Sequence, residues 1–395
     1  MIAFINQIFH RSLIVIINQT SIIITIPYLA NIFSYESFAI FSQAIVFIQI
    51  TWILSEWGIG NYSINIFPKS KNFQFKLFIE INYLVLLLLL AISACLFLII
   101  TFMSTNIDSK LFYILLFSFI FGGLNPLWFF QAQLRPKVLI LPTLLSRLVF
   151  VLFIFLFVKN DQDIYLYFIL NGLIFFFIFF YSLIILIREG LKFYYVPLPI
   201  IFNHFKSSFN FFISSLLGNQ FASIWMFFFT LYSSPYLISI YAIGDHFLRA
   251  INTVSNIVAN VIWANFKKNL IAVLKLHLIS FLIFLSIPIG WILIKPLIMF
   301  FFNESFYESI LICRILLIVW GLNFIFKIYM YPLFSKINSV DWVNFTIIKF
   351  GLLQLLAIGV WVLFLKNIWA MMTIMILILS LQLIYFSYKY LRKKY

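Results

Sequence analysis

Three basic side chains lie near the middle of long apolar runs: Arg147, Arg249 and Lys327. An ionisable group inside a bilayer costs about 2.5 to 3.5 kcal/mol on insertion scales, so such groups usually face other protein or a water-filled cavity. A guanidinium is planar, stays charged, and is suited to two parallel hydrogen bonds with a phosphate. We therefore expect these cations to line a cavity and to bind an anionic group such as a phosphate or pyrophosphate.

Each of these cations also has a second interpretation. Arg147 would instead form an ion pair between helices with an acid such as Glu56. Arg249 follows Asp245 by four residues, so an ion pair within one helix is the favoured interpretation for these two. Their functional alternative is a switch, in which Arg249 binds an anion in one state and Asp245 in the other. Lys327 has a flexible stem that would let its ammonium reach towards the membrane surface.

Two acids of the N-terminal half are candidates for ion coupling. Glu56 or Glu80 would take up a proton if it were buried without full pairing, because burial favours the neutral acid. The alternative for both is a place at the cytoplasmic end of a helix, and for Glu80 this alternative is favoured. Arg314 lies closer to the outer end of its apolar run, so we expect it to anchor that helix at the membrane interface.

Residue patterns typical of catalytic or metal sites are absent from the sequence. The four histidines lack metal-ligand spacing, and there is neither a Gly-x-Ser-x-Gly nor a Gly-x-x-x-x-Gly-Lys segment. We therefore expect no metal, no cofactor and no energy supply from ATP bound to this chain. Cys95 and Cys313 both fall within apolar runs, and we expect them to be small core residues rather than a disulfide or metal ligands.

The composition predicts an all-α polytopic membrane protein. Of 395 residues, 65% are hydrophobic and only 9% are charged, and the mean hydropathy is +1.12. This is more apolar surface than one water-facing globule could bury. The net charge of +15 then indicates cytoplasmic loops that face anionic lipid rather than a nucleic-acid partner.

The apolar runs and the basic residues together predict a topology. A spanning helix needs about 20 mainly apolar residues. Twelve candidates are 12–32, 38–64, 77–103, 111–133, 138–158, 164–187, 207–231, 236–263, 273–301, 309–334, 344–365 and 368–390. With the N-terminus inside, eighteen of the 26 Lys and Arg residues lie on the cytoplasmic side and four on the outer side. Because Lys and Arg are enriched in cytoplasmic loops, both termini are predicted to be cytoplasmic.

The longest connection divides the predicted helices into two sets of six. It contains Pro197 and Pro199 and lies between the sixth and seventh helices. We predict an N-terminal six-helix lobe at 1–188, a cytoplasmic linker at 189–206 and a C-terminal six-helix lobe at 207–395, arranged around a central cavity. Two homologous lobes are a common transporter design. The first apolar run lacks a signal-peptide cleavage site, so we expect an uncleaved first helix.

The segment from Gly122 to Pro136 closes an apolar run with aromatic residues, two amides and a cation. This order predicts a membrane helix that ends at a water interface. Pro126 removes a backbone donor and Gly122 and Gly123 weaken the helix one turn earlier, so we expect a kink here.

The same segment carries a family resemblance. Its Pro126, Trp128, Phe129, Phe130 and Gln131 resemble the Pro-x-Trp-Phe-Phe-Gln-Gly-x-Glu signature of the polysaccharide transporter family, the O-antigen flippases. Ala132 and Gln133 stand where the family usually has Gly and Glu. This family belongs to the multidrug, oligosaccharidyl-lipid and polysaccharide exporter superfamily.

Three further segments extend the resemblance at lower specificity. Glu56 to Asn61 is similar to the acidic-aromatic-Gly-x-x-Asn segment that ends helix two in these flippases. Ser146-Arg147 occupies the place of their helix-five arginine. Tyr241 to Ala250 resembles their helix-eight segment, Tyr-x-x-Ala-acid-basic, with Asp245 one place later than usual and His246 where Lys or Arg is usual.

The resemblance implies a function and its partners. The expected substrate is an undecaprenyl-pyrophosphate-linked oligosaccharide, flipped across the inner (plasma) membrane for O-antigen or similar surface-polysaccharide assembly, with lipopolysaccharide as one product. The expected mechanism is alternating access, with possible proton or sodium coupling, and possible partners are a polysaccharide polymerase and chain-length proteins. The two alternatives are a multidrug-type exporter of small molecules and a membrane enzyme such as a polysaccharide polymerase or glycosyltransferase.

Overall fold

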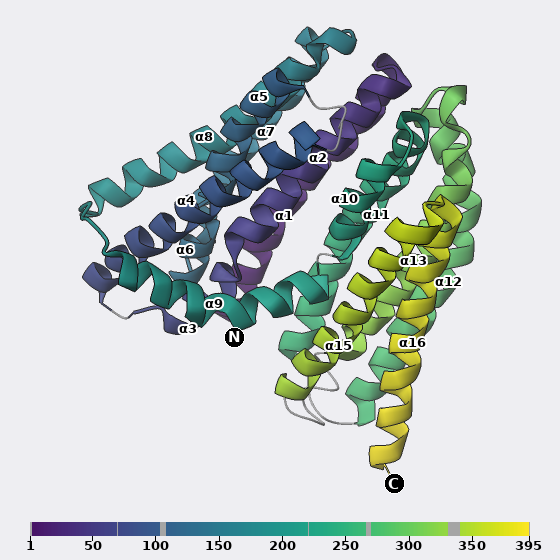
Figure 1. Cartoon of the computed structure of the whole chain (residues 1–395). Helices are drawn as coiled ribbons and strands as arrows, with labels where there is room; N and C mark the ends of the chain where they lie inside the picture. Colours follow the sequence, from purple (N-terminus) through teal and green to yellow (C-terminus); the bar gives the residue numbers. More distant parts are fainter. Residues whose placement is uncertain are drawn as a thin grey trace. The chain divides into compact units, whose positions relative to one another are not determined.

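The computed structural model describes residues 2–68, 70–102, 108–219, 221–265, 270–330 and 340–394. The described chain is helical and contains no strand. It forms two compact units, shown in Figure 1: unit 1 comprises Met1–Thr25 and Ile32–Phe227, and unit 2 comprises Ile26–Asn31 and Phe228–Tyr395. The predicted lobe boundaries at 188 and 207 stay a prediction.

The helices of the first part of the chain are α1 (Ile2–Ile32), α2 (Tyr35–Glu56), α3 (Ile59–Ile66), α4 (Lys71–Phe102), α5 (Ser109–Gly123), α6 (Leu127–Ala132), η1 (Pro136–Leu139), α7 (Ile140–Phe157), η2 (Asp161–Asp163), α8 (Ile164–Arg188) and α9 (Leu198–Asn219). The remaining helices are α10 (Phe221–Tyr232), α11 (Pro235–Asn265), α12 (Leu270–Phe301), η3 (Glu304–Phe306), α13 (Ser309–Tyr329), α15 (Val340–Val360), η5 (Trp361–Leu365) and α16 (Ile368–Lys394).

Ten helical stretches in the described residues are long and apolar enough to cross a membrane, which identifies a multi-pass membrane protein. They are Ser12–Ile32, Tyr35–Glu56, Lys71–Ile99, Ser109–Ala132, Pro136–Phe157, Asp161–Arg188, Leu274–Phe301, Ser309–Tyr329, Phe345–Leu365 and Ile368–Lys389. The predicted spans at 207–231 and 236–263 are not among these ten. The number twelve and the cytoplasmic termini therefore stay predictions.

The second predicted span, 38–64, is wrong in its extent, because α2 ends at Glu56. Trp57 and Gly58 have φ angles of 45° and 69°, a left-handed conformation that stops the helix. A Cβ atom on Gly58 would lie 2.3 Å from the backbone nitrogen of Phe212 in α9. Only glycine fits where the backbone of α9 approaches so closely, and the chain then continues as the short helix α3.

Unit 1 is built around α5, which packs against α8, α2 and α4, while α7 packs against α8. The expected kink near Pro126 is a break between α5 and α6. The preceding glycines permit close packing: a Cβ on Gly122 would lie 2.2 Å from the indole of Trp52 in α2, and one on Gly123 would lie 2.9 Å from Leu89 in α4.

Unit 1 has two ends that are fixed by different contacts. At one end, the amide of Ser34 donates to Oδ1 of Asp161 at 2.8 Å, and the hydroxyl of Tyr165 donates to Oδ2 of Asp108 at 2.9 Å. The other end holds the turn at 57–58, the segment 124–139 and helix α9, which lies across the first turns of α4 (Figure 1). We call this second end the α9 end. Because α9 begins at Leu198, the predicted linker 189–206 is partly helical.

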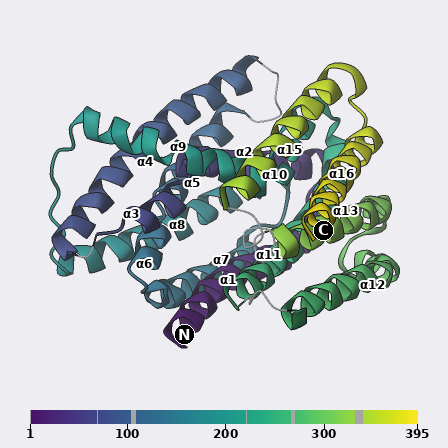
Figure 2. The same cartoon turned by 90° about the horizontal axis from the view of Figure 1, so that it is seen from below.

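In unit 2, α13 is the central helix and packs against α11, α12 and α16 (Figures 1 and 2). Glycines bring the helices together here as well: a Cβ on Gly244 of α11 would lie 2.8 Å from Leu316 in α13. Of the two cysteines, Cys313 is buried as predicted, but Cys95 is exposed, so the prediction of a core residue is wrong for Cys95.

Candidate functional site

Arg147 lies inside unit 1, as its position in the apolar run predicts. Its side chain leaves α7 and is only 6% exposed. Its Nε donates to Oδ1 of Asn18 in α1 at 2.8 Å, and its guanidinium lies 5.8 and 5.5 Å from the ring centres of Phe150 and Phe175. Within the described residues no carboxylate lies in ion-pair distance of Arg147, so its positive charge is held by an uncharged amide.

Lys327, which is half-buried in unit 2, also has an asparagine partner. Its Nζ, on α13, donates to Oδ1 of Asn256 in α11 at 2.8 Å. No carboxylate in the described part of the chain lies in ion-pair distance of this ammonium either. Each unit thus contains a cation within its apolar helices that is held in place by an asparagine of a neighbouring helix.

Asp245 and Arg249 form the predicted ion pair within α11, from Nε of Arg249 to Oδ2 of Asp245. Asp245 is 2% exposed, and its Oδ1 has no hydrogen-bond partner in the described structure. The pair is neutral as a whole, so Arg249 differs from the two amide-bound cations. Whether it exchanges partners in a switch stays a prediction. Glu56, the other acid considered for coupling, is the last residue of α2 and is exposed.

Arg314 contacts the neighbouring helix, and its role as an anchor at the membrane interface stays a prediction. Its Nε donates to the carbonyl of Trp291 at 3.0 Å, and its guanidinium lies 5.4 Å from the indole centre of the same residue. A described partner in α12 therefore fixes Arg314 to the neighbouring helix. This makes Arg314 a suitable control for experiments on Arg147.

The aromatic motif forms a packed helix end. Pro126 precedes the first turn of α6, and the side chains of Phe129 and Phe130 are fully buried. The ring of Phe129 meets Phe78 edge to face at 4.9 Å, and Trp128 stacks on Phe78 at 6.0 Å. The segment thus attaches α6 to α4, and Gln131 is half-buried in the same short helix.

An ion-pair cluster follows the motif at the α9 end. The chain reverses at Leu134, which has a φ angle of 62°, and Arg135 then makes two hydrogen bonds to the carboxylate of Glu189, at 2.8 and 3.2 Å. Lys71 lies 3.7 Å from the same carboxylate. The hydrogen bonds from Arg135 hold the pKa of Glu189 below its usual value. This cluster joins the start of α4, the end of α8 and the segment after α6.

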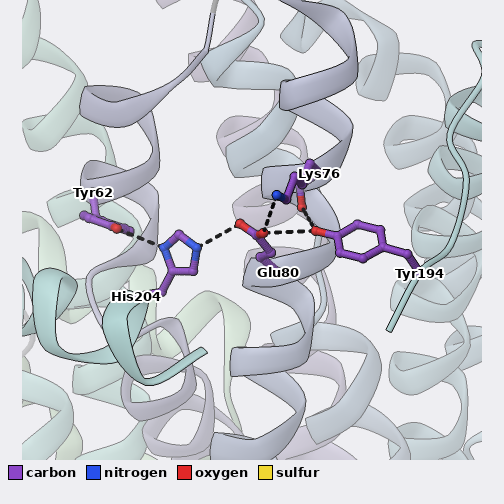
Figure 3. Close-up of polar contacts among 5 residues, drawn as sticks. All are labelled: Tyr62, Lys76, Glu80, Tyr194 and His204. Atoms are coloured by element: carbon purple, nitrogen blue, oxygen red, sulfur yellow. Dashed lines mark hydrogen bonds and ion pairs between the residues drawn. The ribbon is translucent and has the colours of Figure 1, made fainter. Parts of the chain in front are cut away.

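A second polar cluster lies at the same end and surrounds Glu80 (Figure 3). Glu80 is 7% exposed on α4, and its Oε2 lies 3.0 Å from Nε2 of His204 in α9. Its Oε1 lies 3.1 Å from the hydroxyl of Tyr194, in the connection before α9, and 3.9 Å from Nζ of Lys76. Nδ1 of His204 lies 2.9 Å from the hydroxyl of Tyr62 in α3. One carboxylate therefore fastens α9 and the preceding connection to α4.

The two tyrosines of this cluster remain hydrogen-bond donors at neutral pH. Burial raises the pKa of Tyr194, and the neighbouring carboxylate of Glu80 raises it further. Burial is also the largest cause of the raised pKa of Tyr62. Sequence analysis placed Glu80 at a helix end but missed this cluster. Because His204 is 124 residues away in the chain, no local spacing could have revealed the contact.

Among the described residues, no group of three or more His, Cys, Asp or Glu side chains is placed so that it could hold a metal ion. The candidate functional residues are therefore described unit by unit: unit 1 contains the amide-bound cation Arg147, and unit 2 contains the amide-bound cation Lys327 and the ion pair of Asp245 and Arg249.

Comparison with known proteins gives one match. A family model described as polysaccharide biosynthesis protein matches residues 5–264. The matched region includes the aromatic motif, Arg147 and the pair of Asp245 and Arg249, and it ends before Lys327. The searches of curated proteins and of solved structures found no match to the chain.

Proposed function

Because the chain belongs to the polysaccharide biosynthesis protein family, which includes the O-antigen flippases, we propose that it is a flippase for a lipid-linked oligosaccharide. The proposed substrate is an undecaprenyl-pyrophosphate-linked repeat unit of an O-antigen or similar polysaccharide. The protein moves the headgroup across the cytoplasmic membrane while the lipid tail stays in the bilayer. It is a transporter and not an enzyme.

The observation that carries this proposal is the way in which Arg147 is held. A pyrophosphate headgroup must lose much of its hydration on entering an apolar space, and that loss is costly unless fixed charges replace the water. Arg147 offers a guanidinium whose described hydrogen bond, to Asn18, uses only Nε. Its two terminal nitrogens have the geometry that binds a phosphate with two parallel bonds. Lys327, held by Asn256, adds a second cation of this kind.

The mechanism that we propose is alternating access by two lobes, a common design among transporters. In this proposal Arg147 of unit 1 and Lys327 of unit 2 each compensate headgroup charge during crossing, and Arg249 supplies a further cation when it leaves Asp245. An inward gradient of protons or sodium ions would supply the energy. A polysaccharide polymerase and chain-length proteins would act on the product at the outer leaflet of the inner membrane, and both termini would be cytoplasmic.

A flipping assay in liposomes tests this function. The purified chain is reconstituted, and a lipid-pyrophosphate oligosaccharide is supplied on the inner leaflet. An external glycosidase then reports how fast the glycan becomes accessible. We expect protein-dependent exposure that is faster than in empty vesicles.

Three results would contradict the flippase proposal. Absence of exposure under every ion gradient would exclude flipping of this substrate. A glycan that becomes longer in the presence of the protein would instead show polymerase activity. Export of an organic cation, without flipping of the oligosaccharide, would favour the multidrug-type exporter.

A further inference from the structure

Helix α9 is not one of the ten candidate membrane spans, yet one strip of its surface is both apolar and exposed. Leu198 and Phe202 are each 64% exposed and Phe209 is 44% exposed. At 100° per residue these three side chains fall within 40° of one another around the helix axis. We call these three residues the aromatic face of α9, after Phe202 and Phe209, which supply its two rings.

The neighbouring strip of α9 is firmly attached to unit 1. Ile201, Ser208 and Phe212 are buried there. The indole of Trp57 stacks on Phe212 at 4.0 Å and donates through Nε1 to the carbonyl of residue 205 at 3.1 Å. Together with the contact between His204 and Glu80 (Figure 3), these interactions fix the rotation of α9 about its axis. The exposure of the aromatic face is therefore imposed by the packing.

The rest of the exposed arc of α9 is polar. Asn203, Ser207 and Asn210 lie on the side away from the buried strip, and Lys206 stands between them and the aromatic face. From the buried strip outwards, the helix surface thus changes from aromatic to basic to polar. This order matches a helix that lies in the plane of a membrane interface, with aromatic rings in the headgroup region, a lysine at the boundary and amides in water.

The connection before α9 continues this surface. Phe193 is 64% exposed and Tyr195 is 76% exposed, while Tyr194 between them points inward to Glu80. Lys192 is exposed beside them. Aromatic side chains with adjacent lysines are the composition of an interfacial anchor.

The charge at this end selects the partner. Arg188, Lys192 and Lys206 are exposed, whereas the acids at this end are the exposed Glu56 at the end of α2 and two acids that are engaged within the protein. Glu189 is bound by Arg135 and Lys71, and Glu80 is buried in its cluster. The surface is therefore positive, and it complements an anionic lipid leaflet.

We propose that the aromatic face of α9, with Lys192 and Lys206, binds the anionic phospholipid surface of the leaflet at the α9 end. This function is separate from flipping, because the phospholipid here is a binding partner and not the cargo. The Glu80 cluster and Trp57 act as positioning residues that hold the surface in register with the membrane.

Spin labels on the full chain test this proposal. In protein whose Cys95 and Cys313 are replaced by serine and alanine, single labels are placed through Phe202→Cys and Asn203→Cys. Both positions are exposed, so neither substitution disturbs the packing of α9. The proteins are inserted into two kinds of nanodisc, one of phosphatidylcholine alone and one of phosphatidylcholine mixed with anionic phosphatidylglycerol. The accessibility of each label to oxygen, which prefers lipid, is compared with its accessibility to a water-soluble nickel complex.

We expect the ratio of oxygen to nickel accessibility to be several-fold higher at position 202 than at position 203 in the anionic nanodiscs. This difference should decrease in phosphatidylcholine alone. It should also decrease in anionic nanodiscs when Lys192→Gln and Lys206→Gln are introduced together. The matched control, Lys110→Gln with Lys159→Gln, removes two cations near the opposite end of unit 1 and should leave the difference unchanged.

Three outcomes would overturn the proposal. Equal ratios at positions 202 and 203 would show that the aromatic face does not enter lipid. A label at 202 that is immobilised and shielded from both reagents would show that a protein covers this face. A ratio that is the same with and without phosphatidylglycerol would exclude recognition of the anionic headgroup.

Discussion

Replacing Asn18 by aspartate places a carboxylate against Arg147 without removing the guanidinium. Nε of Arg147 lies 2.8 Å from Oδ1 of Asn18, so Asn18→Asp creates an ion pair inside unit 1. If Arg147 carries the headgroup, its charge is then neutralised before the substrate arrives. A hydrogen bond to a charged group contributes about 1.5 to 3 kcal/mol, and 1.36 kcal/mol changes a rate tenfold. We therefore expect flipping to slow by about 10- to 150-fold.

The matched control is Asn18→Ala, which removes the amide but leaves the charge of Arg147 uncompensated. We expect it to slow flipping much less than Asn18→Asp does, because the charge of Arg147 stays available although its position is no longer fixed by Asn18. The assay is the initial rate of glycosidase accessibility in liposomes, accompanied by the thermal unfolding of each variant. Asn18→Asp should unfold at the same temperature as the natural protein or higher, because it gives a buried cation an acidic partner. Equal flipping rates in the aspartate and alanine variants would refute the reasoning.

Three further predictions concern other parts of the chain. In unit 2, Asn256→Asp should neutralise Lys327 and slow flipping, and an unchanged rate in liposomes would remove Lys327 from the proposed path. Gly58→Ala should lower the unfolding temperature more than Gly190→Ala. Both glycines have positive φ angles, and the left-handed strain of an alanine alone costs about 1 to 2 kcal/mol at each, but only Gly58 is in close contact with another helix, α9. Glu189 has a lowered pKa, so it stabilises the fold above the ordinary Glu pKa and loses this effect as pH falls through its folded-state value. The loss of stability caused by Glu189→Gln should therefore be constant between about pH 6 and about pH 8 and should become smaller in acid. Unfolding curves measured at each pH check this. A loss of stability that grows in acid would contradict it.

The sequence was informative where local pattern decides the structure. Apolar runs of spanning length predicted most of the long helices, because burial of each helix in lipid depends on its own composition. The spacing of Asp245 and Arg249 predicted their ion pair, since residues four apart share a helix face. The inward direction of Arg147 followed from the cost of exposing a charge to lipid.

Contacts between distant segments could not be predicted in this way. The end of α2 at Glu56 depends on the close approach of α9 to Gly58, about 150 residues later. The burial of Glu80 depends on His204 and Tyr194, which belong to other elements. The asparagine that holds Arg147, Asn18, is 129 residues away from it in the chain. In each case the partner is selected by packing, which a single sequence does not display.

The central claim is that fixed cations carry an anionic headgroup across the membrane. The most direct measurement compares the flipping rate of one oligosaccharide on two carriers, a pyrophosphate lipid and an uncharged lipid, in liposomes with the natural protein and with Arg147→Gln; Arg314→Gln is the control. We predict that Arg147→Gln slows the pyrophosphate substrate strongly and the uncharged one little, while Arg314→Gln slows neither. An equal effect of Arg147→Gln on both carriers would contradict the claim, because Arg147 would then act on something other than the headgroup charge.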